Sequence, residues 1–121
     1  RGTKKPFQHF GHPKLNLYNY SFIPKSVPGS KYPKHENKIC YGKDLTNTPI
    51  LNSMNLDWLI ETYNQTNNKD EFFNNFFDKL SGTDKLRKQI ISGKSSREIK
   101  KSWKNELNEF KNIRNKYLLY N

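Results

Sequence analysis

The pattern of apolar positions in the last third of the chain is helical. Apolar residues recur there at steps of three and four, which places them on one face of a helix, and they are Ile99, Trp103, Leu107, Phe110, Ile113 and Tyr117. Ser95 and Glu98 have the spacing of a capping box, in which each side chain satisfies a backbone donor at a helix start. We therefore predict one long helix that begins at Ser95 and carries all six apolar residues.

A shorter helix is predicted just before the long one. It opens at residues 82–84 and stops at Gly93, a residue that suits the left-handed conformation past a helix end. Leu86 and Ile90 supply its apolar face. The two helices should form a hairpin, with Trp103 packed against the shorter partner.

The middle of the chain, residues 52–81, also has a helical pattern. The apolar face of its first helix is formed by Leu56, Leu59, Ile60 and Tyr63, and the residues that could cap it are Asn52, Ser53 and Asn55. Four phenylalanines follow within six residues, namely Phe72, Phe73, Phe76 and Phe77. Aromatic clusters of this density are mostly core, so we predict that they are buried.

The first fifty residues have the composition of strands and loops. All six prolines and four of the six glycines fall there. The apolar runs at 7–10, 18–23 and 39–45 predict strands, and residues 27–30 predict a turn. Pro24 ends the second strand, because a proline can lie only at a sheet edge or at a strand end. We therefore expect an α+β fold in which this small strand-and-loop half packs on the C-terminal helical hairpin, with residues 1–121 as a single domain.

The charge of the chain raises the question of an anionic partner. The formal net charge is +11, but eighteen of the twenty-two basic residues are lysine and they are spread along the chain. Arginine, the better reader of phosphates and base edges, occurs four times. We therefore favour a solvated basic surface over nucleic acid as a partner. A negatively charged polymer of another kind stays open as a partner.

Two features of the sequence concern its cellular context. No apolar run is long enough to predict a membrane span. The chain opens on Arg1 rather than Met, so we expect a fragment or a processed product whose targeting segment is lost.

The residue types that most often carry catalysis or bind metals form no compact group in the sequence. Candidate metal ligands in the first half are His9, His12, His35 and Cys40. Their spacing is not typical of a zinc site, so we expect no metal and no cofactor. Cys40 should be a small buried side chain of its strand, and His12 is either a turn residue or a polar ring that points into a cleft. No two carboxylates in this half form an evident acid/base pair of the kind that glycoside hydrolysis needs.

Short motifs along nearly the whole chain are shared with one known family. They are Arg1-Gly2-Thr3 with Pro6-Phe7, Gly11-His12-Pro13, Phe22 with Pro24, Pro33-Lys34-His35, Cys40-Tyr41-Gly42 with Asp44-Leu45, the stretch Phe77–Thr83 and the tail Arg114–Tyr120. In this order the chain resembles the C-terminal region of the NamZ-type exo-β-N-acetylmuramidases (glycoside hydrolase family 171, formerly a domain of unknown function).

The resemblance implies a two-domain hydrolase with a Rossmann-like catalytic domain upstream and an active site in the cleft between the domains. Such a glycosidase removes terminal β-1,4-linked N-acetylmuramic acid from peptidoglycan fragments, as in cell wall recycling, in the periplasm or outside the cell. In the family pattern the plausible catalytic Glu lies just before Arg1. This chain would then be the accessory domain, inactive alone, whose partner is the upstream catalytic domain of the same polypeptide.

If the resemblance holds, five residues are candidates for binding muramyl saccharides: Arg1, Thr3, His12, Lys34 and His35. Muramic acid carries a lactyl carboxylate, which a guanidinium can grip through two parallel hydrogen bonds. His12 and the loop of residues 30–35 should face the same cleft if the strand ends point toward the junction with the catalytic domain. The structural alternative is that Arg1 belongs to a linker and that Lys31, Lys34 and His35 belong to a mobile, solvated loop.

A second function remains open at this point. The chain could be a free-standing basic binding module for an anionic polymer, nucleic acid or cell-wall glycan, with no enzymatic partner domain. An upstream Rossmann-like coding region that ends in Glu-Gly would decide for the hydrolase.

Overall fold

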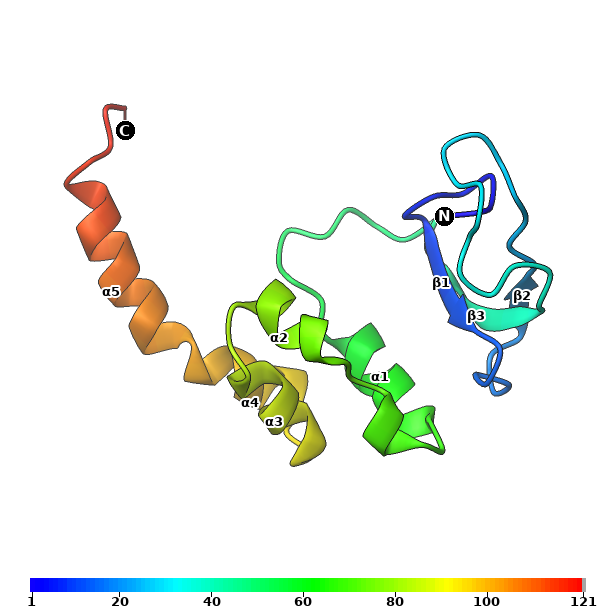
Figure 1. Ribbon diagram of the computed structural model, residues 1–121. Coiled ribbons are helices and arrows are strands. Elements are labelled where there is room, and N and C mark those ends of the chain that lie inside the picture. The colour runs from blue at the N-terminus through cyan, green and yellow to red at the C-terminus, as the bar shows by residue number, and fades with distance from the viewer. Residues whose placement is uncertain (121) are drawn as a thin grey trace. The chain divides into compact units, whose positions relative to one another are not determined.

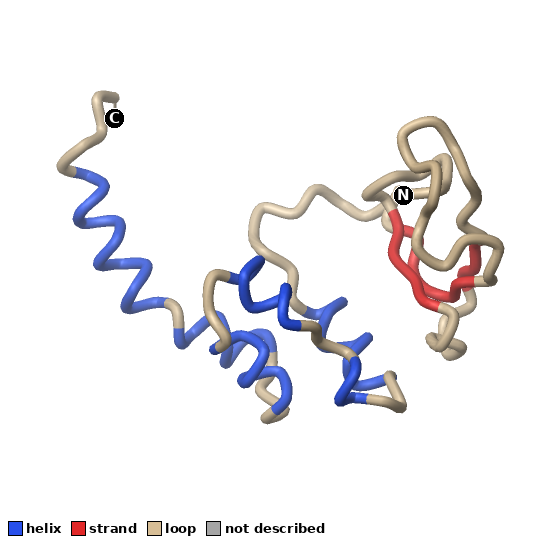
Figure 2. Tube along the Cα trace, viewed as in Figure 1, coloured by secondary structure: helices blue, strands red, loops and turns tan. Residues whose placement is uncertain are grey.

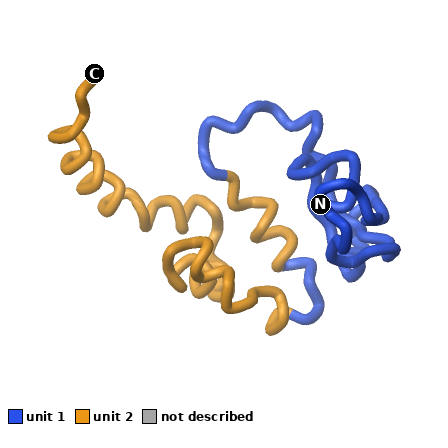
Figure 3. Tube along the Cα trace, turned by 45° about the horizontal axis from the view of Figure 1, so that its top comes forward, with its two compact units in different colours: residues 1–54, 64–68 blue, residues 55–63, 69–121 orange. Residues whose placement is uncertain are grey.

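The computed structural model describes residues 1–120, with three strands in the first half and the helices in the second (Figures 1 and 2). The elements are β1 His9–His12, β2 Tyr20–Phe22, β3 Cys40–Asp44, α1 Asp57–Gln65, a 3-10 turn η1 Lys69–Glu71, α2 Asn75–Ser81, α3 Lys85–Ile91, α4 Ser96–Ser102 and α5 Lys104–Asn115. The predicted α+β class is confirmed. Residues 1–54 and 64–68 form one compact unit, the sheet unit, and residues 55–63 and 69–121 form a second, the helical unit (Figure 3).

The sheet unit is built on three antiparallel strands in the order β1-β3-β2. The predictions for β2 and β3 are confirmed, and β2 is an edge strand, whereas the strand predicted at 7–10 is displaced and lies at 9–12. Pro6 and Phe7 form a turn instead, in which the Gln8 amide donates to the Lys5 carbonyl at 3.2 Å. Phe7 has a φ of 61° in this turn, a conformation rare for a bulky residue, and its side chain is 91% exposed.

A pair of glycines lies opposite each other at the centre of the sheet. Gly11 of β1 pairs with Gly42 of β3. A Cβ on Gly42 would overlap the carbonyl oxygen of Phe10, and one on Gly11 would lie 2.7 Å from the ring of Phe22. Because neither glycine has a side chain, the Phe22 ring lies close over Gly11 and stacks on His9, with 4.0 Å between ring centroids.

The helical unit has its own apolar core, as the periodicity predicted. Four buried residues form it, namely Leu56, Tyr63, Ile90 and Ile99, and partly buried side chains pack around them, namely Leu59, Ile60, Phe72, Phe73, Leu86 and Trp103. Asn55 caps α1, because its side-chain oxygen accepts from the Asp57 amide at 2.9 Å. The prediction that the four phenylalanines are buried holds only in part, since Phe72, Phe73 and Phe77 are half-buried and Phe76 is exposed.

The prediction of one long C-terminal helix is wrong, although its start is confirmed. Ser95 and Glu98 form the capping box at the beginning of α4, but the helix breaks at Trp103 and continues as α5. In an unbroken helix the Trp103 amide would donate to the Ile99 carbonyl. The Ser102 hydroxyl donates to the Ile99 carbonyl instead, at 2.6 Å, and the Trp103 amide donates to the Lys100 carbonyl at 3.2 Å. A serine that competes for a backbone acceptor in this way commonly bends a helix.

Candidate functional site

A hollow of about 600 Å³ opens in the sheet unit, and we call it the histidine pocket. Its lining residues come from the N-terminus, the three strands and residues 24–35: Arg1, His9, Phe10, Gly11, His12, Phe22, Pro24, Ser30, Tyr32, Pro33, Lys34, His35 and Cys40. Three imidazoles, one guanidinium and one ammonium therefore border a single cavity. No carboxylate is among these lining residues.

His9 is fixed in the wall of this pocket by contacts on every side. Its Nδ1 lies 2.9 Å from the Tyr20 hydroxyl, and its Nε2 lies 2.8 Å from Thr3 Oγ1. One face of the ring stacks on Phe22. A neutral imidazole has one donor and one acceptor nitrogen, and both are used here, so His9 is a positioned wall residue rather than a free base.

The first five residues form a strap that is tied to the sheet unit at three points. The Gly2 carbonyl accepts from the Lys25 amide at 2.8 Å, the Thr3 hydroxyl contacts His9, and Lys5 Nζ lies 2.6 Å from Asp44 Oδ2. Gly2 is buried, with a φ of 78°. These contacts hold Arg1 at the pocket.

The far end of the strap is secured by an ion pair. Lys5 and the hydroxyl and amide of Thr46 all donate to Asp44, and these hydrogen bonds hold the pKa of the Asp44 carboxyl well below its usual range. The same contact raises the pKa of Lys5. Both groups are partly exposed, so the pair orients the strap more than it stabilises the fold.

His12 and His35 meet edge to face on the opposite side of the pocket, with 4.6 Å between ring centroids. The Lys14 amide donates to His12 Nδ1 at 3.1 Å, which leaves Nε2 to carry the proton of the neutral ring. His35 has a φ of 61°. Left-handed backbone at a non-glycine residue costs free energy and tends to mark functional sites, so this strained histidine is a reasonable site residue.

The environment lowers the pKa of all three imidazoles. Burial is the main cause in each case, and the positive neighbours Lys34 and Lys38 add to it at His35, as His35 and Lys34 do at His12. At neutral pH the pocket therefore presents neutral imidazoles beside two cationic side chains, Arg1 and Lys34.

These lowered pKa values predict a loss of stability in mild acid. Between the folded-state pKa values and the ordinary value of about 6.5, the unfolded chain binds more protons than the folded chain, so the free energy of unfolding falls as the pH is lowered through that window. We expect a lower melting temperature at pH 5.5 than at pH 7.5. A variant with His9, His12 and His35 all changed to Gln should lose most of this difference, whereas an undiminished difference would show that other groups cause it.

Cys40 lines the pocket but is not activated as a nucleophile. Its side chain is buried, as predicted, and burial raises the pKa of the thiol. A reactive cysteine needs the opposite, a lowered pKa and an adjacent base. Within residues 1–120, no three side chains of the metal-binding types lie close enough to hold a metal ion.

The structure brings four of the five predicted site residues together. Arg1, His12, Lys34 and His35 all line the histidine pocket, and Thr3 lies beside it as the partner of His9. His12 is the last residue of β1 and borders the cavity rather than serving only as a turn residue. The sequence reasoning missed the positioning role of His9.

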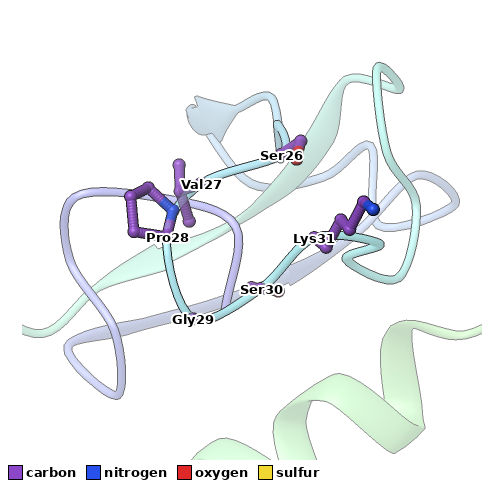
Figure 4. Close-up of a pocket in the computed structure, with 6 residues that line it drawn as sticks. All are labelled: Ser26, Val27, Pro28, Gly29, Ser30 and Lys31. Carbon is purple, nitrogen blue, oxygen red and sulfur yellow. The ribbon is translucent and has the colours of Figure 1, made fainter.

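A second hollow, of about 490 Å³, has a simpler construction. Figure 4 shows that its walls come from one turn, Ser26 to Lys31. The Ser30 amide donates to the Val27 carbonyl at 2.9 Å, and Gly29 has a φ of 82°, as the predicted turn requires. Lys31 is the one charged residue among the lining side chains, so this hollow offers little to recognise a ligand.

Comparison with known proteins places the chain in a family. The family described as "Exo-beta-N-acetylmuramidase NamZ, C-terminal" matches residues 1–120. The chain belongs to the NamZ C-terminal family. Within residues 1–120, no helix is both long and apolar enough to cross a membrane.

Two relatives show how far the likeness to NamZ proteins extends. The "Peptidoglycan beta-N-acetylmuramidase NamZ" of Bacillus subtilis (strain 168) is 30% identical over 137 residues, which cover 99% of this chain and 33% of that protein. A crystal structure of a DUF1343 family protein from Bacteroides fragilis NCTC 9343 matches with a TM-score of 0.90 and 47% identity, over 99% of this chain and 35% of that one. The chain thus spans about a third of the length of the two relatives that it matches.

Proposed function

We propose that this chain is the C-terminal part of a peptidoglycan hydrolase that releases terminal N-acetylmuramic acid, and that its histidine pocket binds the anionic part of the sugar. The observation that carries the first half is the family match over residues 1–120. The proposed binding of the anionic part of the sugar rests on the histidine pocket, because both of its charged lining residues are cationic.

The chemistry of muramic acid explains why a cationic pocket would suit it. The sugar differs from N-acetylglucosamine by a lactyl ether that ends in a carboxylate. Arg1 can bind a carboxylate through two parallel hydrogen bonds, and Lys34 adds a single positive charge. The neutral imidazoles of His12 and His35 can donate hydrogen bonds to ether, hydroxyl or acetamide oxygens.

The acid and base of the reaction would lie outside this chain. Glycosidases of the common type place two carboxyl groups on either side of the scissile bond, and the lining residues of the histidine pocket supply none. In this proposal the catalytic carboxylates belong to the upstream region, and the pocket contributes binding and orientation of the terminal sugar. A periplasmic or extracellular location goes with this role.

The test is a specificity ratio in the full-length enzyme. Arg1→Ala should lower kcat/KM for a muramide relative to the matched glucosaminide by about tenfold to a hundredfold, equivalent to ~1.5–3 kcal/mol for a lost charge-assisted contact. Arg1→Lys should recover only part of the ratio, because an ammonium lacks the planar fork.

Arg97→Ala is the matched control for Arg1→Ala. It removes an exposed arginine from α4, outside the histidine pocket, and should leave the ratio unchanged. If all three variants and the wild type share one ratio, Arg1 is a structural residue and the carboxylate is recognised elsewhere.

The isolated chain should not hydrolyse a chromogenic N-acetylmuramide. The expected result is no turnover above the uncatalysed rate, since the proposed catalytic carboxylates are not in it. Turnover by the pure chain that is abolished by changing one of its own carboxylates would refute the assignment of catalysis to the upstream region.

A further inference from the structure

The helix α5 presents an apolar stripe that the rest of the helical unit leaves exposed. The stripe consists of Leu107, Phe110 and Ile113 on α5 and Tyr117 just after it. Of their side-chain surface, 49% is exposed at Leu107, 59% at Phe110 and 56% at Ile113. The sequence places these residues at steps of three and four, the spacing of a helix face that packs against something.

The rest of the helical unit gives α5 little support. The core residues Leu56, Tyr63, Ile90 and Ile99 all precede it, and none of its residues is buried. Its described ion pair with α3, Lys85 to Glu106 at 3.2 Å, lies on the surface, where such pairs contribute little. A free helix of this length is marginal in water, so a stable α5 needs a partner for its stripe.

The tail that follows α5 also exposes large apolar side chains. Leu118, Leu119 and Tyr120 are all exposed. Together with the stripe they form a run of seven large apolar side chains within fourteen residues, more than a monomer surface normally leaves in water at one place. We call this surface the α5 arm.

Family membership points to the occupant of the α5 arm. The matched region is the C-terminal one, and roughly two thirds of each relative lies outside the match. The likeness to the Bacteroides protein covers 99% of this chain, so a counterpart of the α5 arm exists in a polypeptide nearly three times as long. In those proteins the largest surface available to cover it is the region that precedes the family domain.

We propose that the α5 arm is the docking surface for the region of the same polypeptide that precedes this family domain. The arm would pack its stripe into an apolar groove of that region and so couple the folding of the two. This inference rests on family membership and on exposure, and it does not depend on the proposed activity.

Amide hydrogen exchange of the full-length protein tests this proposal without an activity assay. The amides of residues 107–115 should exchange at least about a hundredfold more slowly than in a free helix, and the protection should not change with protein concentration. In the double variant Phe110→Ser/Ile113→Ser, the same amides should exchange at least about tenfold faster than in the wild type. The matched control is Asn108→Ser combined with Lys111→Ser, which also introduces two serines into α5 but on its polar face. This control should leave the protection intact.

Three results would overturn the proposal. Fast exchange of α5 in a folded, monomeric full-length protein would show that the stripe is free. Protection that rises with concentration, together with a doubled mass in light scattering, would show that a second copy covers it. Equal behaviour of the two double variants would show that the protection does not come from the stripe. The wild-type measurement decides the first two even if a variant fails to fold.

Discussion

Gly42→Ala should lower the free energy of unfolding of the sheet unit by about 3 kcal/mol or more. A glycine in a strand ordinarily weakens it, and replacement by alanine would then stabilise the fold by about 0.4–1 kcal/mol. The sign reverses here because the new Cβ would overlap the Phe10 carbonyl oxygen and the Gly11 backbone. Backbone atoms cannot rotate away as a side chain can, so β1 must separate from β3.

Gly29→Ala is the control for Gly42→Ala. A Cβ at Gly29 meets open space, but φ is 82° there, so the expected cost is the left-handed strain of about 1–2 kcal/mol. Both tryptophans, Trp58 and Trp103, lie in the helical unit, so the sheet unit is followed by amide exchange of β3. Equal losses in the two variants would show that steric overlap at Gly42 is not the cause.

Gly42→Ala should also disturb the histidine pocket. The stack of Phe22 on His9 depends on the close approach of β1 and β3 at the glycine pair. His9 in turn holds Thr3, and the strap that contains Thr3 holds Arg1 at the cavity. The pocket is therefore a product of sheet register rather than of any local motif.

The sequence predicted well those elements whose signal is local. The capping box of Ser95 and Glu98, the cap at Asn55 and the stop at Gly93 each depend on a few neighbouring residues, and all three are found. The break at Trp103 was missed because its cause is a competition between the Ser102 hydroxyl and the Trp103 amide for one carbonyl. The three- and four-residue spacing of the apolar side chains continues across such a break, so this spacing cannot reveal it.

The first strand was misplaced for a similar reason. Phe7 looks like a strand residue by composition, yet the preceding Pro6 favours the second position of a turn, and the turn carries Phe7 into left-handed backbone. The sequence signal that was available was the proline, whose fixed φ and missing N–H make it a poor start for a paired strand.

The sequence named candidate site residues but could not indicate how they are arranged. The resemblance supplied Arg1, His12, Lys34 and His35, and these residues do share one cavity. The role of His9 depends on the registers of β1 and β2 against β3, which bring it opposite Asp44 and near Tyr20 and Phe22. Register between strands that lie thirty residues apart is a tertiary property, so no spacing in the sequence could indicate it.

Ile90→Ala should destabilise the helical unit by about 2–5 kcal/mol, the usual range for removing a buried isoleucine side chain. Ile90 is 1% exposed and belongs to the core cluster with Leu56, Tyr63 and Ile99. Truncation would leave a cavity at the point where α1, α3 and α4 meet.

The neighbouring Ile91 provides an unusually close control: it has the same side chain on the same helix, yet it is 51% exposed. Ile91→Ala should change stability by no more than about 0.5 kcal/mol, and both substitutions bring the same small gain in helix propensity. Tryptophan fluorescence during urea unfolding reports on this unit alone, because Trp58 and Trp103 both belong to it. If the two variants unfold at the same urea concentration, the helical face assigned to α3 is wrong.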